Sequence, residues 1–141
     1  MVASPPPPPP SGDEEPAALT IDAAYKKVRK AARAADAAES DEQRDEELHR
    51  IRKRAKRLRY TASATGDDKV ADRAKAVQSL LGDHQDSVVS RGHLIKEAAT
   101  AHAAGEDTFT YGVLYQLEEE VARRAEENLG ATLKKLRKSV T

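Results

Sequence analysis

The sequence predicts an all-α protein, a bundle of four to five helices that follows a proline-rich tail. Apolar residues recur every three or four positions from Ile21 onward, which is the spacing of helices with one buried face. The chain has one Phe and no Trp, and runs of β-branched and aromatic residues, which strands favour, are almost absent. Alanine supplies much of the apolar content, and such small side chains suit closely packed helices better than a sandwich or barrel.

The first 18 residues differ in composition from the rest of the chain. They contain all seven prolines, six of them consecutive, and the acidic residues Asp13, Glu14 and Glu15. Such a segment has too little apolar surface to offset the entropy lost on ordering. We therefore predict a disordered tail over residues 1–18 and one helical domain over residues 19–141. The proline run serves either as a spacer or as a ligand for an aromatic groove on another protein.

Charge and cysteine content exclude several classes of function. The formal net charge is zero, so an electrostatic function must depend on where the charges lie. The absence of cysteine excludes disulfides and thiolate metal sites, which agrees with a reducing compartment. The start, MVAS followed by prolines, lacks a secretory apolar segment, and no apolar run is long enough for a membrane span. We expect a cytoplasmic protein with no membrane contact and no cofactor.

The first two helices have clear sequence signals. An apolar stripe predicts a helix over Ile21–Ala38. A second helix is predicted over Asp41–Ala64, because Ser40 and Gln43 have capping-box spacing and acidic residues crowd the first turns. Gly66 then suits the left-handed position that follows a helix end.

The rest of the chain predicts two or three further helices. Asp67 or Asp68 caps the third, which reaches Gly82, and this glycine either ends or kinks it. A segment over Asp83–Ala103 follows, and the last helix is predicted over Thr108–Ser139, where the apolar stripe is sustained over many turns.

The second helix carries the most informative pattern in the chain, between His49 and Tyr60. On a helical wheel, Lys53, Lys56 and Tyr60 fall within about 40° of His49. Flanking positions within about 80° hold the arginines Arg52, Arg57 and Arg59. The opposite side is apolar and consists of Leu48, Ile51, Ala55 and Leu58. The helix is thus apolar on one side and cationic on the other.

An ordinary solvated face is the alternative interpretation of this charge run. Solvated helices usually alternate acids with bases, because opposite charges at i, i+4 stabilise a helix and like charges destabilise it. Between His49 and Tyr60 there are seven Lys or Arg and no acid. In the last helix, by contrast, Glu118–Glu120 lies near Arg123 and Arg124. The segregated charge therefore favours a polyanion site.

Two other groups of basic residues accompany this helix. The first helix has a basic row at helical spacing, and side-by-side packing would let both basic faces flank one groove; this row is Lys26, Arg29, Lys30 and Arg33. The chain end has a second group, which interaction with a helix C-terminal dipole explains: Lys134, Lys135, Arg137 and Lys138.

His49 has two interpretations. Neighbouring cations disfavour its charged form, so it should be neutral near pH 7 until an arriving phosphate favours the imidazolium, which would then donate hydrogen bonds to the anion. The alternative is a capping or packing histidine.

Three segments resemble one known family. They are HRIRKRAKRLRY (49–60), LLGDHQDSVV (80–89) and AYKKVRKAARAAD (24–36). Together they resemble the CHAD domain, a helical domain named for its conserved histidines, and the likeness covers about Leu19 to Thr141. The resemblance implies a helical bundle lining a basic cavity that binds inorganic polyphosphate. For some members it also implies association with storage granules.

The resemblance also assigns roles to residues. The positions that match the anion-facing helix of the family are His49, Arg52, Lys53, Lys56, Arg57 and Tyr60. Gly82 and Asp86 match a Leu-Gly…Asp element, in which Asp86 would orient a cation rather than contact the anion. The family domain has two pseudo-symmetric halves, and this chain is similar to the C-terminal half. It is therefore either a half-domain with a missing companion half or a subunit of a homodimer. The homodimer is slightly favoured, because a lone half-domain would leave apolar and basic surface exposed.

Non-catalytic polyphosphate binding is the leading functional hypothesis. A scaffold protein at polyphosphate or other storage granules and a nucleic-acid-binding module are the alternatives. Nucleic acid is disfavoured because the basic helix offers one Tyr for stacking and no recognised fold signature. An enzyme is disfavoured because nucleotide-binding loops, HExxH pairs and nucleophile elbows are absent. His84, His93 and His102 recur every nine residues, which alternates helix faces and argues against a metal site.

Overall fold

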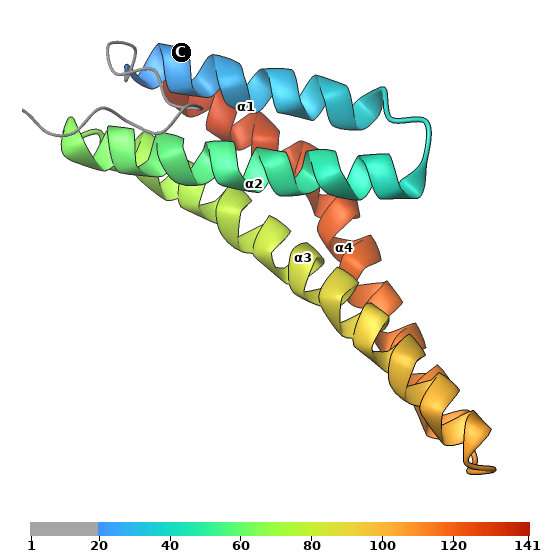
Figure 1. Cartoon of the computed structure of the whole chain (residues 1–141). Coiled ribbons are helices and arrows are strands. Elements are labelled where there is room, and N and C mark those ends of the chain that lie inside the picture. Colours follow the sequence, from blue (N-terminus) through green and yellow to red (C-terminus); the bar gives the residue numbers. More distant parts are fainter. Residues whose placement is uncertain (1–19) are drawn as a thin grey trace, which may run out of the picture.

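The computed structural model describes residues 20–141, and within them all regular structure is helical (Figure 1). The described residues form four α-helices: α1 Ile21–Asp36, α2 Asp41–Ala64, α3 Asp68–Ala103 and α4 Phe109–Val140. The predicted all-α class is confirmed, with four helices as the outcome. The predicted tail, residues 1–18, lies outside the described residues.

Side-chain caps set the boundaries of the first two helices. The N–H of Gln43 donates to Ser40 Oγ at 3.1 Å, and Gln43 Oε1 accepts from the Glu39 N–H at 3.1 Å, so the predicted capping pair forms. Gly66 is left-handed, with φ of 80°. The predicted bounds of α2 are confirmed, while α1 ends at Asp36 instead of Ala38. The chain leaves α1 early because Ser40 must be extended to cap α2.

Of the two alternatives predicted for Gly82, a helix end is wrong. The third helix continues through this glycine, and the segment predicted over Asp83–Ala103 is the second part of α3, a helix of 36 residues. Leu81 and His84, on either side of this glycine, are both buried. Burial of these flanking side chains outweighs the roughly 1 kcal/mol that a glycine costs inside a helix.

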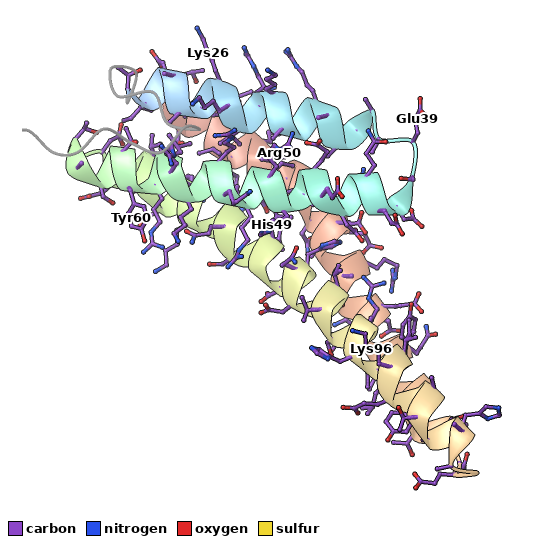
Figure 2. The ribbon with its side chains drawn as sticks, in the orientation of Figure 1. Lys26, Glu39, His49, Arg50, Tyr60 and Lys96 are labelled. Carbon is purple, nitrogen blue, oxygen red and sulfur yellow. The ribbon has the colours of Figure 1, made fainter. Side chains whose placement is uncertain are left out.

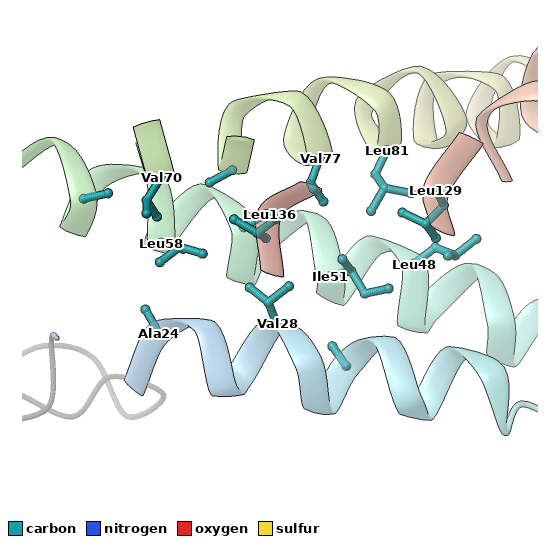
Figure 3. Packing of buried hydrophobic residues seen from close by; sticks show 14 of the residues in the cluster. Ala24, Val28, Leu48, Ile51, Leu58, Val70, Val77, Leu81, Leu129 and Leu136 are labelled. Atoms are coloured by element: carbon teal, nitrogen blue, oxygen red, sulfur yellow. The ribbon is translucent and has the colours of Figure 1, made fainter. Parts of the chain in front are cut away.

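The core lies where all four helices meet. α2 packs between α1 and α3, α4 packs along α3, and α1 makes little contact with α4. Figure 3 shows Val28 of α1, Leu58 of α2, Val77 of α3 and Leu136 of α4 converging in this core. Each of these side chains is at most 1% exposed. The apolar side of α2 is therefore held inward, which fixes the direction of its basic side.

Beyond the core, α3 and α4 continue together as a two-helix arm that ends in the loop between them (Figure 1). Most of the exposed large apolar residues lie on these two helices: Val89, Ile95, Phe109, Val113, Leu114, Leu117 and Val121. Because single exposed apolar residues are common but groups of them are not, the arm is a candidate contact surface.

Candidate functional site

The basic side of α2 faces outward, as the helical wheel predicts. The apolar side is buried, with Leu48, Ile51, Ala55 and Leu58 at most 1% exposed. Lys53, Lys56 and Tyr60 are exposed, and His49 is half-buried. Figure 2 shows His49 and Tyr60 on the same side of α2, while Arg50 lies toward α1. We call this surface the basic face: His49, Arg52, Lys53, Lys56, Arg57, Arg59 and Tyr60.

The carboxylates within residues 20–141 leave much of the basic face unneutralised. Arg50 pairs with Glu47 at 3.4 Å, and Arg57 also has an interaction partner. Within residues 20–141, Arg52, Lys53 and Lys56 form no ion pair with a carboxylate. Like charges one turn apart repel one another, so this arrangement costs stability unless an anion binds.

Arg59 and Tyr60 form the end of the basic face nearest Gly66. The guanidinium of Arg59 donates from Nη1 to Gln78 Oε1 of α3 at 3.2 Å and lies 5.7 Å from the centre of the Tyr60 ring. A guanidinium has five N–H donors, so Arg59 keeps donors for an anion after making this contact. The exposed phenol of Tyr60 lies beside it.

Gly82 of α3 provides the surface on which Arg52 rests. A Cβ atom at this glycine would lie 3.5 Å from Arg52 Nε and 3.8 Å from its Nη2. Arg52 Nε is buried and has no hydrogen-bond partner in the described part of the chain. The bare backbone of Gly82, one of the residues that the family resemblance singles out, thus lets the guanidinium of Arg52 lie against α3.

Substitution of Gly82 should separate a helix effect from a binding effect. Gly82→Ala places only an ordinary contact beside Arg52 and should stabilise α3 by about 0.5 to 1 kcal/mol without changing anion affinity. Gly82→Leu should displace the guanidinium and weaken anion binding several-fold. Thermal denaturation and anion titration of both variants check this. Equal affinity of the Leu and Ala variants would contradict it.

His49 adds a second group with an open hydrogen-bonding position. Its Nδ1 is buried and has no partner among the described residues. Burial, followed by the charges of Lys53 and Arg52, lowers the pKa of His49. The ring is therefore neutral near pH 7, as the sequence predicts, and it lies between cations that would gain from an anion.

The structure does not bring the basic row of α1 into this face. The core side of α1 is formed by Ala24, Val28, Ala31 and Ala35, and its basic side points the opposite way. In Figure 2, Lys26 extends from the side of α1 that faces away from α2, far from His49 and Tyr60. The predicted shared groove between the two basic faces is therefore absent: Lys26, Arg29, Lys30 and Arg33 form a separate surface.

Asp86 is predicted to orient a cation of the basic helix rather than to contact the anion. Its side chain is exposed, and within residues 20–141 it forms no ion pair or hydrogen bond with a cation of α2. It lies one turn beyond Gly82 on α3. Gly82, by contrast, lies beside Arg52 of the basic face.

A polar cluster that the sequence did not predict surrounds His84, which is buried and 2% exposed. Its Nε2 lies 3.7 Å from Asp45 Oδ1 and 3.7 Å from Glu126 Oε2. These two contacts join α3 to α2 and α4. Arg44 pairs with Glu126 at 2.6 Å and donates to the Ala35 carbonyl. Burial raises the pKa of Asp45, although His84 and Arg91 oppose this. A cleft of about 340 Å³ opens here.

The four histidines differ in burial. Within residues 20–141 no group of three or more His, Asp or Glu side chains is placed so that it could hold a metal ion. His93 and His102 are exposed, and His84 alone is buried. The signal that was available in the sequence was the position of His84 on the apolar side of α3, near Leu81.

Comparison with protein families matches residues 1–95 to the CHAD domain. This range includes α1, α2, Gly82 and the basic face, and it ends within α3, short of the Thr141 that the sequence likeness was expected to reach. The chain belongs to the CHAD domain family.

Two similar proteins come from Mycobacterium tuberculosis: Uncharacterized protein MT2285 of strain CDC 1551 / Oshkosh and Uncharacterized protein Rv2226 of strain ATCC 25618 / H37Rv. Each is 64% identical over 129 residues, which is 89% of this chain and 25% of the relative. The chain thus spans about a quarter of the length of these relatives. No solved structure matches it. None of the described helices is both long and apolar enough to cross a membrane.

Proposed function

We propose that the basic face binds inorganic polyphosphate without cleaving it. The observation that carries this proposal is the exposed side of α2, where Arg52, Lys53 and Lys56 have no carboxylate partner within residues 20–141. Membership of the CHAD family supports polyphosphate over other polyanions. A cytoplasmic location, with association to storage granules, follows from the same proposal.

The lysines and the arginine of the basic face would contact phosphate in different ways. Lys53 and Lys56 are mobile point charges that follow successive phosphates, while Arg52 presents planar donors to one phosphate. Each neutralised phosphate releases condensed counterions, as in nucleic-acid binding, so affinity should depend steeply on salt. Hydrogen bonds from the His49 ring would complete the site once that ring is protonated.

Titration with long-chain polyphosphate at two salt concentrations tests this function. We expect binding that weakens steeply between about 50 and 200 mM salt, because several ion contacts are involved. Duplex DNA and RNA at equal phosphate concentration serve as competitors, and they should displace little polyphosphate. Weak binding that ignores salt would refute a polyphosphate site, and equal displacement by nucleic acid would refute its selectivity.

A scaffold role is a second candidate, and the two-helix arm favours it. Phe109 is 74% exposed and Leu117 is 54% exposed, so the arm offers apolar surface to another protein. A companion CHAD half or a second copy of the chain would cover part of this surface. Sedimentation equilibrium with and without polyphosphate tests the homodimer, and a monomer under both conditions would exclude it.

His49 should make polyphosphate affinity depend on pH. In the free protein the pKa of His49 is lowered, so the ring is neutral near pH 7, and a bound polyanion favours its protonated form. Affinity should therefore rise as pH falls from about 7.5 to 6, and His49→Gln should flatten this rise. Calorimetric titration in buffers of different ionisation enthalpy would also detect proton uptake on binding.

The stability of the ligand-free fold should fall as pH falls, whereas polyphosphate affinity should rise. Because the folded protein binds the His49 proton more weakly than the unfolded chain, this group reduces stability as pH falls below about 6.5. Binding and stability thus respond to the same proton with opposite signs. If His49→Gln left the pH dependence of affinity unchanged, the role of His49 would be disproved.

A further inference from the structure

A groove separates α1 from the last turns of α4. These helices make little contact with each other, and a cavity of about 320 Å³ opens between them. Its floor is uncharged and includes Tyr25, Val28 and Leu133, whose side chains belong to the core or pack against it. We call this the α1–α4 groove.

The rim of the α1–α4 groove is entirely cationic. Arg29 lines it from α1, and Lys134 and Arg137 line it from α4. Within residues 20–141 no acidic residue lines the groove, and none of these three cations forms an ion pair. Although the net charge of the whole chain is zero, charge of one sign gathers around an apolar floor.

We propose that the α1–α4 groove docks an acidic helical peptide segment of a protein partner, with a large apolar side chain seated on the groove floor. Its carboxylates would meet Arg29, Lys134 and Arg137 at the rim. The α1–α4 groove lies between two helices and suits a third helix, which places apolar anchors one turn apart and acids beside them. This site is separate from the basic face of α2 and does not depend on it.

Two other occupants fit the groove less well. A bare phosphate chain would gain nothing from the floor around Tyr25 and Leu133. A bilayer is flat, whereas these apolar side chains are recessed, and neither α1 nor the part of α4 beyond Val121 has an exposed large apolar residue to insert. A peptide with a protruding side chain can use both the floor and the rim.

A designed peptide provides the test. The probe is a 16-residue amphipathic helix with Leu on one face and Glu on both flanks, and its control has Ser in place of Leu. Titrated by fluorescence anisotropy against the full chain, the Leu peptide should bind at least tenfold more tightly than the Ser peptide. Equal affinity, or no binding of the Leu peptide at about 1 mM, would overturn the proposal.

Variants locate the site on the chain. Arg29→Glu combined with Arg137→Glu should weaken the Leu peptide at least tenfold. Gly130→Phe should have a similar effect, because the space beside this helical glycine is open and a ring there would fill the groove without disturbing the fold. Lys96→Glu combined with Arg124→Glu, at exposed positions elsewhere, is the matched control and should change little.

Substitutions can test the polyphosphate site and the peptide site independently. Lys53→Glu with Lys56→Glu should lower polyphosphate affinity at least a hundredfold and leave the Leu peptide bound, whereas the groove variants should weaken the Leu peptide and leave polyphosphate bound. Anionic phospholipid vesicles form a further arm of the test. If Arg29→Glu with Arg137→Glu released the chain from vesicles while peptide affinity stayed unchanged, the groove would be a lipid site and the peptide proposal would be wrong.

Discussion

Replacing Lys53 and Lys56 together with Glu is expected to lower polyphosphate affinity at least a hundredfold. Both lysines are exposed on the basic face, and neither has a carboxylate partner within residues 20–141. A charge-assisted contact contributes about 1.5 kcal/mol or more, and each 1.4 kcal/mol changes affinity tenfold, so two lost contacts already give about this factor. Titration at fixed salt measures it.

Two matched double variants act as controls for this loss. Lys26→Glu with Lys30→Glu reverses two charges one turn apart on the outer side of α1, which the structure separates from the basic face. Lys96→Glu with Arg124→Glu reverses two charges on α3 and α4. Each should weaken binding only a few-fold through long-range charge. If the α1 pair had as large an effect as the α2 pair, the assignment of the site to α2 would fail.

His84→Ala is expected to lower the free energy of unfolding by about 2 to 3 kcal/mol. The substitution removes a buried ring and leaves the half-buried Asp45 and Glu126 without the group that lies between them. Because His84 joins α2, α3 and α4, the loss should appear in global unfolding. Urea denaturation followed by circular dichroism measures it.

The same helix supplies a control for this prediction. His93 is exposed and lies nine residues after His84 on α3, so His93→Ala should change stability by no more than about 0.5 kcal/mol. His49→Gln should likewise leave stability near neutral pH almost unchanged while it alters binding. A stable His84→Ala variant would show that the buried cluster contributes little to the fold.

Most of the fold could be predicted because the caps and turns that set the helix bounds depend on residues close together in the sequence. Ser40, Gln43 and Gly66 set the bounds of α2 through contacts within a few residues, which a sequence displays directly. Gly82 misled the prediction because the residues that keep α3 continuous there, Leu81 and His84, act through contacts with other helices. The two-helix arm is likewise a consequence of this unbroken helix.

The same distinction applies to the site. The side of α2 on which His49, Lys53 and Lys56 lie follows from helical geometry, so the sequence predicted it. The direction of Lys26 relative to that face depends on how α1 packs on α2. The periodicity of the α1 sequence does not determine this packing. The pairing of His84 with Asp45 and Glu126 joins three helices far apart in sequence, and only their packing reveals it.

Mapping the bound polyanion onto the chain by NMR would locate the polyphosphate site residue by residue. With isotopically labelled protein and long-chain polyphosphate, we expect the largest shifts on residues 49–60 and on the His49 ring, with smaller changes near Gly82. Shifts confined to α1, to the end of α4 or to the arm would contradict it, as would a spectrum that polyphosphate leaves unchanged.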